Sequence, residues 1–228
     1  MQKIITGVLV ILWPLLLGAG LKDKLKEKLQ PQPATTSSAV KPDEQAGIKF
    51  KLTDEEVEKA LTWGKAHKQA ELMAAYEAVW AGGLGGFSMA MGAVMPKALV
   101  ATRYYQIAAY AQEQTSKYQE VDPKRVEEIR SGSGLSVAFT ATNLYPEFPK
   151  NLHVVLKQGD KVIQPTTLQG KDQHPKLQVD HDSRTWYADF SAVFPETDLD
   201  PKAKSFLVII DTARNWEQKI TLDFNKMR

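Results

Sequence analysis

The sequence predicts an α+β protein, a small helical region followed by a seven-stranded antiparallel β-sandwich of the immunoglobulin-like kind. From residue 53 to 130, apolar residues recur three and four positions apart, which is the period of an amphipathic helix. From 135 to 224 they alternate with polar residues in seven short runs, a density typical of a β-sandwich. The expected segments are a signal peptide or membrane anchor (1–20), an amphipathic turn and flexible linker (21–47), the helical region (48–131) and the β-sandwich domain (132–228).

The first segment has the pattern of an export signal. Lys3 precedes an uncharged run, residues 4–20, that ends in the small residues Gly18 and Gly20, which suit a signal-peptidase site. The run is also just long enough to span a bilayer, so an uncleaved anchor is the alternative. Four lysines between positions 22 and 28 oppose export, because positive charge favours the cytoplasmic side. We expect an exported protein, periplasmic or extracellular, either released by cleavage or anchored by residues 4–20.

The linker and the helical region have clear local signals. Residues 31–46 combine three prolines with Thr, Ser and Ala and show no apolar period, as in a flexible spacer. Thr53 and Glu56 have the spacing of a capping box and predict the start of the first helix. A second helix is expected over Gln69 to Trp80, and a third from Pro96, because proline suits the first turn of a helix. Asp122-Pro123 predicts the start of a fourth.

The strands of the second half are separated by turn signals. Gly159-Asp160 lies between two apolar runs and predicts a two-residue hairpin. The alternation places most aromatic residues, Trp186 and Phe190 among them, on the core side of their strands. Tyr187 falls on the opposite side of its strand and is expected to be exposed. The loops at 143–150 and 193–204 are the expected contact sites, at one end of the sandwich.

A glycine- and methionine-rich segment, 81–96, has two interpretations. It contains neither the P-loop order nor GxGxxG, so it does not predict phosphate binding. A buried connector between helices is the favoured interpretation, because large exposed apolar patches are uncommon. Membrane attachment is the alternative, and it would use the bulky apolar residues Leu84, Phe87, Met89 and Met91.

Composition and motifs indicate no catalysis and no cofactor. The 29 basic and 27 acidic residues give a net charge of +2 and are mixed along the chain. We therefore expect no nucleic-acid partner. There is no cysteine, and no GxSxG or SxxK motif. The weak candidates for a metal site, or for a hydrolase or metal-dependent enzyme, are His174, Asp180 and His181, whose spacing matches no specific zinc signature and is typical of an Asp-rich turn.

The functional expectation is therefore a binding or assembly protein of the bacterial cell envelope, whose partner is an unknown envelope protein or a membrane surface. Tyr145, Phe148 and Tyr187 are the candidate contact residues in the sandwich. The stretches "LTDEEVEKALTWGKAHK" and "HVVLKQGDKVIQP" resemble uncharacterised exported bacterial proteins with a helical front half and a β-sandwich back half. That resemblance implies export and brings no activity, cofactor or functional residue.

Overall fold

The structure, a computed structural model, describes residues 47–79, 96–180 and 183–227. Contacts divide the chain into two units, Met1–Lys41 and Pro42–Arg228, and every described residue belongs to the second. The expected signal or anchor, residues 1–20, lies outside the described residues. None of the helices in the described part is long and apolar enough to cross a membrane.

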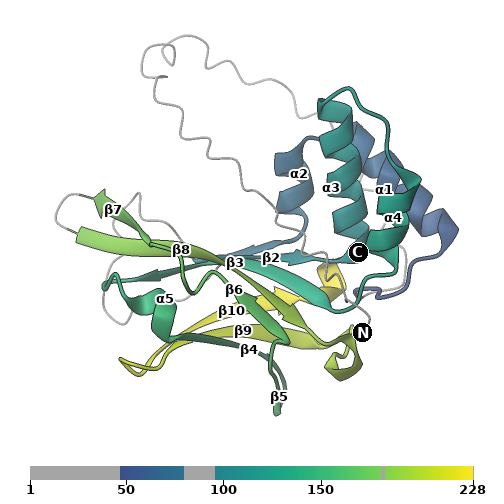
Figure 1. Cartoon of the computed structure of the whole chain (residues 1–228). Helices are drawn as coiled ribbons and strands as arrows, with labels where there is room; N and C mark the ends of the chain where they lie inside the picture. The colour runs from purple at the N-terminus through teal and green to yellow at the C-terminus, as the bar shows by residue number, and fades with distance from the viewer. Residues whose placement is uncertain (1–46, 80–95, 181–182, 228) are drawn as a thin grey trace, which may run out of the picture. The chain divides into compact units, whose positions relative to one another are not determined.

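Helices and antiparallel strands are both present, which confirms the predicted α+β class (Figure 1). The helices are α1 (Asp54–Ala66), α2 (Gln69–Ala74), α3 (Arg103–Ser116), α4 (Pro123–Arg130) and α5 (Phe148–Asn151), with 3-10 turns η1 (Glu196–Asp198) and η2 (Phe224–Lys226). The strands are β1 (Glu77–Val79), β2 (Lys97–Ala101), β3 (Leu135–Asn143), β4 (Leu152–Gln158), β5 (Lys161–Ile163), β6 (Thr167–Gln169), β7 (Lys176–Asp180), β8 (Ser183–Phe194), β9 (Lys204–Asp211) and β10 (Trp216–Asp223).

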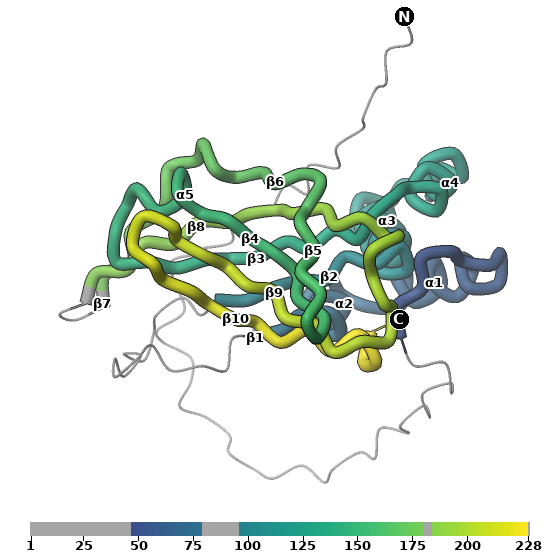
Figure 2. The backbone as a smooth tube through the Cα atoms, turned by 90° about the horizontal axis from the view of Figure 1, so that it is seen from below, coloured from purple at the N-terminus to yellow at the C-terminus, as the bar shows by residue number. Residues whose placement is uncertain are grey.

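The strands form two sheets in a β-sandwich-like arrangement. One sheet has the order β1-β2-β3-β8-β6, with β7 also paired to β8, and the other has the order β10-β9-β4-β5. The tube in Figure 2 shows the two layers one over the other. Each of the seven expected runs has a counterpart among the strands, but the described residues hold ten strands, because β1, β2 and β6 were not expected.

Two of the additional strands come from the region expected to be helical. The predicted third helix does not begin at Pro96: residues Lys97–Ala101 form β2, and α3 starts at Arg103. Ala98, Leu99, Val100 and Ala101 are all buried, so an unbroken apolar run here marks a central strand covered on both faces. The second helix ends at Ala74 instead of continuing to Trp80, and β1 follows it and pairs with β2.

One hydrophobic core joins the two sheets. Phe139 on β3 lies opposite Phe190 on β8, and their rings stack with centroids 5.2 Å apart. The other sheet contributes residues of β4, β9 and β10 to the same cluster, among them Leu156, Leu207, Ile209 and Ile220, each fully buried. The hairpin expected at Gly159-Asp160 is present, because Gly159 takes the positive φ of 58° that the turn requires and joins β4 to β5.

Helices α1 to α4 gather at one end of the sheets, and α5 and β7 lie at the other (Figures 1 and 2). The capping box predicted for α1 is confirmed: the Glu56 N–H donates to the Thr53 hydroxyl, and the Thr53 N–H donates to the Glu56 carboxylate at 2.8 Å. Arg103, buried at the start of α3, ties this helix to the sandwich by donating to the Gly132 carbonyl and to the Glu196 carboxylate. The Glu196 carboxylate also accepts from the Gly134 N–H at 2.8 Å.

Candidate binding groove

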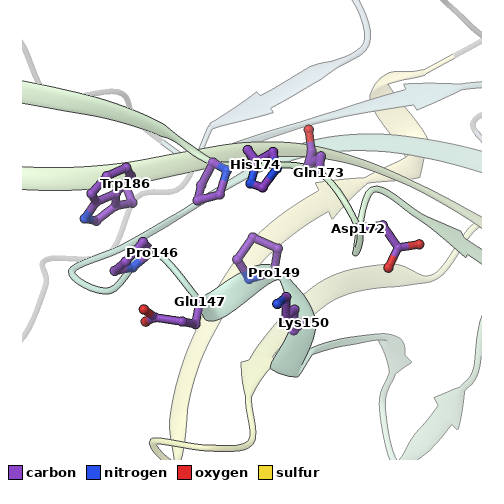
Figure 3. A pocket seen from close by; sticks show the side chains of 9 residues that line it. Pro146, Glu147, Pro149, Lys150, Asp172, Gln173, His174 and Trp186 are labelled. Carbon is purple, nitrogen blue, oxygen red and sulfur yellow. The ribbon is translucent and has the colours of Figure 1, made fainter.

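A groove of about 410 Å³ lies beside α5 and the loop before β7 (Figure 3), which are at the end of the sandwich away from the main helices (Figure 1). Its volume falls within the range of about 300–1,000 Å³ typical of ligand sites. The lining comes from three places in the sequence: the segment around α5, the loop before β7, and strand β8. The lining residues are Pro146, Glu147, Pro149, Lys150, Asp172, Gln173, His174, Pro175 and Trp186.

The register of β3 and β8 places Trp186 at the groove. Phe190, Ala188 and Trp186 are alternate residues of β8 and therefore share the core-facing side of the strand. Phe190 and Ala188 are buried, whereas Trp186 is only partly buried. Trp186 thus ends the core-facing row where the core opens to solvent, and its indole is available to a ligand.

Helix α5 closes the core beside this opening. The Phe148 side chain is fully buried and contacts the Phe190 ring edge-on at a centroid distance of 6.2 Å. Phe148, expected as a contact residue, is therefore not at the surface, because α5 turns its side chain into the core. Pro146, Glu147, Pro149 and Lys150 around it remain on the groove side.

The opposite wall is the loop between β6 and β7, two strands that both pair with β8, and a side chain of the loop adds a further contact to β8. The Gln173 amide donates to the Asp189 carbonyl, which fixes the loop that precedes β7. Gly170 begins this loop with φ of 100°, and a Cβ there would lie 2.7 Å from the same carbonyl oxygen. A side chain at position 170 would push the loop away from β8. Since Pro175 also restricts the backbone, the wall is preorganised.

Charges fix the rim next to α5. The Arg214 guanidinium lies 4.0 Å from the centroid of the Tyr145 ring and 3.1 Å from the carboxylate of Asp211, which is 1% exposed. Arg214 also approaches the Glu147 carboxylate at 3.7 Å, and the Asn143 amide donates to Asp211 at 3.1 Å. These contacts connect the loop after β3 to the β9–β10 turn. The position of the loop is therefore fixed by these contacts as well as by α5.

The structure brings only some of the predicted site residues together. His174 is exposed and lines the groove, Tyr145 is 49% exposed on its rim, and Tyr187 is partly exposed on the other face of β8. His181 and the side chain of Asp180 lie outside the described residues. Within the described ranges, no three His, Cys, Asp or Glu residues are grouped to hold a metal ion.

The four apolar residues proposed for membrane attachment, Leu84, Phe87, Met89 and Met91, also lie outside the described residues. The two loops expected at one end of the sandwich are in fact at opposite ends. Leu135 pairs with Phe194 and Asn143 with Trp186, so the loop that follows β3 and the loop that follows β8 leave the sheet in opposite directions. Only the 143–150 loop reaches the groove.

Sequence reasoning placed Trp186 in the core and did not single out the three prolines. The alternation that assigned Trp186 to the inner face is correct, but no local pattern shows where the covering sheet ends. Comparison with protein-family models, with curated protein sequences and with solved structures finds no match. The arrangement of rigid prolines, an indole and side chains of both charges is suited to binding.

Proposed function

We propose that the protein is an exported or membrane-anchored binding protein of the bacterial cell envelope, and that the groove takes an extended polypeptide segment of a partner. The observation that carries the proposal is the partly exposed indole of Trp186 between walls that contain Pro146, Pro149 and Pro175. Rigid apolar walls lose little conformational entropy on binding, which favours affinity. The envelope location rests on the pattern of residues 1–20.

The polar lining supports a polypeptide over a strongly charged ligand. Glu147 and Asp172 bring negative charge to the groove, and Lys150 brings positive charge. With the Gln173 amide and the His174 imidazole, the lining offers both donors and acceptors. A peptide backbone carries one donor and one acceptor at most residues, so it matches this mixed lining better than a polyanion would.

Strand order supports a further part of the proposal, that the sandwich is immunoglobulin-like. Strands β2-β3-β8-β6 correspond in order and pairing to strands A, B, E and D of that fold, and β10-β9-β4-β5 to G, F, C and C′. In this correspondence the loop after β3 is the B–C loop, and the β9–β10 turn that carries Arg214 is the F–G loop. Antibody variable domains bind with these two loops, which is an analogy of fold and favours a ligand at this end.

A random dodecapeptide library displayed on phage would test the peptide proposal against the full-length protein. We expect enriched peptides to bind the unmodified protein and to lose at least about tenfold in affinity to Trp186→Ala, since a buried aromatic anchor is worth more than 1.4 kcal/mol. Trp216→Ala is the matched control, because Trp216 is also partly buried but does not line the groove. Absence of enrichment, or equal binding to both variants, would contradict the proposal.

Location has a separate test. The N-terminal residue of the native protein and its sensitivity to protease would be compared in intact cells and in spheroplasts. Digestion only after the outer barrier is removed supports an envelope protein, and a start near Leu21 indicates cleavage. An intact Met1 with the remainder of the chain protected in spheroplasts would contradict export.

A further inference from the structure

The charged side chains that line the groove are unevenly placed along it. Figure 3 shows Trp186, Pro146 and Glu147 at one end, and Lys150 and Asp172 towards the other. The Glu147 side chain is directed away from Lys150. The end of the groove that holds the indole therefore has a carboxylate, whereas the ammonium group of the lining lies towards the other end.

The Glu147 carboxylate can accept hydrogen bonds from a ligand. The Arg214 guanidinium approaches it at 3.7 Å, beyond the usual length of a hydrogen bond, and lies closer, at 3.1 Å, to the buried carboxylate of Asp211. The charge of Arg214 is therefore compensated first by Asp211. Because the Glu147 side chain is 62% exposed and an ionised carboxylate accepts several hydrogen bonds, a cation of a ligand can reach it.

The indole of Trp186 offers the second half of a site for a cation. The face of an aromatic ring attracts a Lys or Arg side chain, and tryptophan is the strongest of the three aromatic residues in this respect. The rim already contains one such pair, because the Arg214 guanidinium lies 4.0 Å from the centroid of the Tyr145 ring. Pro146 lines the same end of the groove as Trp186 and can cover the aliphatic part of a long basic side chain.

From these two features we infer that the groove recognises a basic residue of the bound segment, whose cationic group lies over the Trp186 indole and pairs with the Glu147 carboxylate. The inference rests on the proposed peptide ligand and gives that ligand a sequence requirement. Arginine fits better than lysine, because its planar group stacks on a ring and makes two parallel hydrogen bonds with a carboxylate. The charge of the whole lining has the same preference, since the carboxylates of Glu147 and Asp172 outnumber the Lys150 ammonium.

A proline or an aromatic residue of a ligand is the alternative occupant of the indole. Neither carries a charge, so neither would pair with the Glu147 carboxylate, and the affinity of either would not depend on the charge at position 147. Measurements that change only the charge of the ligand or of this side chain therefore separate the alternatives.

A single arginine residue tests the subsite without a whole peptide. N-acetyl-arginine methylamide would be titrated into the ¹⁵N-labelled full-length protein and compared with the citrulline derivative, which has nearly the same shape and no charge. The chain has five Trp, and the indole N–H resonance of Trp186 is assigned from its loss in Trp186→Phe. We expect the arginine derivative to shift this resonance, and the citrulline derivative to shift it at least about fivefold less at the same concentration.

The peptides enriched on the full-length protein give the quantitative test. We expect them to share a basic residue, and its replacement by citrulline, or by norleucine where it is lysine, should weaken binding about tenfold or more. Glu147→Gln should cost about fivefold with the arginine peptide and almost nothing with its citrulline form, because the two changes remove the same ion pair. Glu113→Gln is the matched control, since Glu113 on α3 is 54% exposed, pairs with Lys117 and does not line the groove.

Two results with the peptides would overturn this inference and leave the peptide proposal standing. One is a set of peptides that need Trp186 and share no basic residue, and the other is equal affinity for the arginine and citrulline forms. Equal shifts of the Trp186 resonance by the two derivatives would also overturn it. No enriched peptide, together with no shift from either derivative, would contradict both the proposed function and the inference.

Discussion

Replacing Gly64 by alanine should destabilise the protein, although alanine is the better helix former. Gly64 lies in α1 where this helix crosses α3, and a Cβ atom there would be 2.0 Å from the carbonyl oxygen of Ala108. The same Cβ would be 2.8 Å from the Ala108 Cα. Both atoms are backbone, so no side-chain rotation relieves the overlap. To reach an ordinary contact of 3.4 Å from 2.0 Å, the helices must separate by about 1.4 Å.

The free-energy cost follows from two opposing terms. Overpacking a well-packed interface costs about 1–3 kcal/mol, and a separation this large belongs at the upper end. Exchanging glycine for alanine within a helix returns about 1 kcal/mol. We therefore expect the free energy of unfolding to fall by about 2 kcal/mol, which corresponds to about 4–8 °C in Tm for a chain of this length. Ala60, Ala108 and Ala111, all fully buried, would lose contacts as the helices part.

Urea unfolding of the full-length protein, followed by far-ultraviolet circular dichroism, measures this change. Gly132→Ala is the control, because Gly132 follows α4 without a positive φ, and its added Cβ would come no closer than 3.2 Å to a neighbouring atom. We expect the control to change stability by less than about 1 kcal/mol. A Gly64→Ala variant as stable as the unmodified protein, or more stable, would refute the close crossing of α1 and α3.

Three further predictions concern ionisable groups. Glu196→Ala leaves the buried Arg103 guanidinium without its carboxylate, and we expect a loss of about 3 kcal/mol in urea unfolding; a loss under about 1 kcal/mol would indicate a dispensable pair. Burial raises the pKa of Tyr105 to about 12, so the stability it contributes is complete below pH 10 and is lost as pH rises towards 12. Tyr105→Phe should flatten that part of the stability profile. Burial alone would raise the pKa of Glu56, but hydrogen bonds to its carboxylate lower it below 4.5, so stability should fall with pH below that value and fall less in Glu56→Gln.

Elements determined by neighbouring residues were predicted from the sequence. Thr53 and Glu56 are three positions apart, and their hydrogen bonds require no other part of the chain. The turn at Gly159 is local in the same sense, because its positive φ and the two flanking runs are sufficient to form the hairpin. In each case the physical determinants lie within a few residues of the element.

Strand β2 was not predicted because its determinants are distant. Four consecutive buried residues after Pro96 suit a buried helix and a central strand equally well. The choice is made by β1 on one side and β3 on the other, whose backbone groups satisfy those of β2. The groove escaped prediction for the same reason, since the exposure of Trp186 depends on where the facing sheet ends.

The position of β2 determines how this protein can be divided into fragments. A fragment that begins at residue 132 would contain β3 but would lack the strand that covers its edge, leaving Val137 and Phe139 beside unpaired backbone. Such a fragment would expose a long apolar edge and is an aggregation hazard. Helix α2 is followed by β1, and β2 is followed by α3, so the helices are joined in sequence to the sheet that β2 completes. Heating should therefore unfold residues 47–227 in one cooperative transition, and limited proteolysis should leave no stable fragment that consists of the sandwich alone.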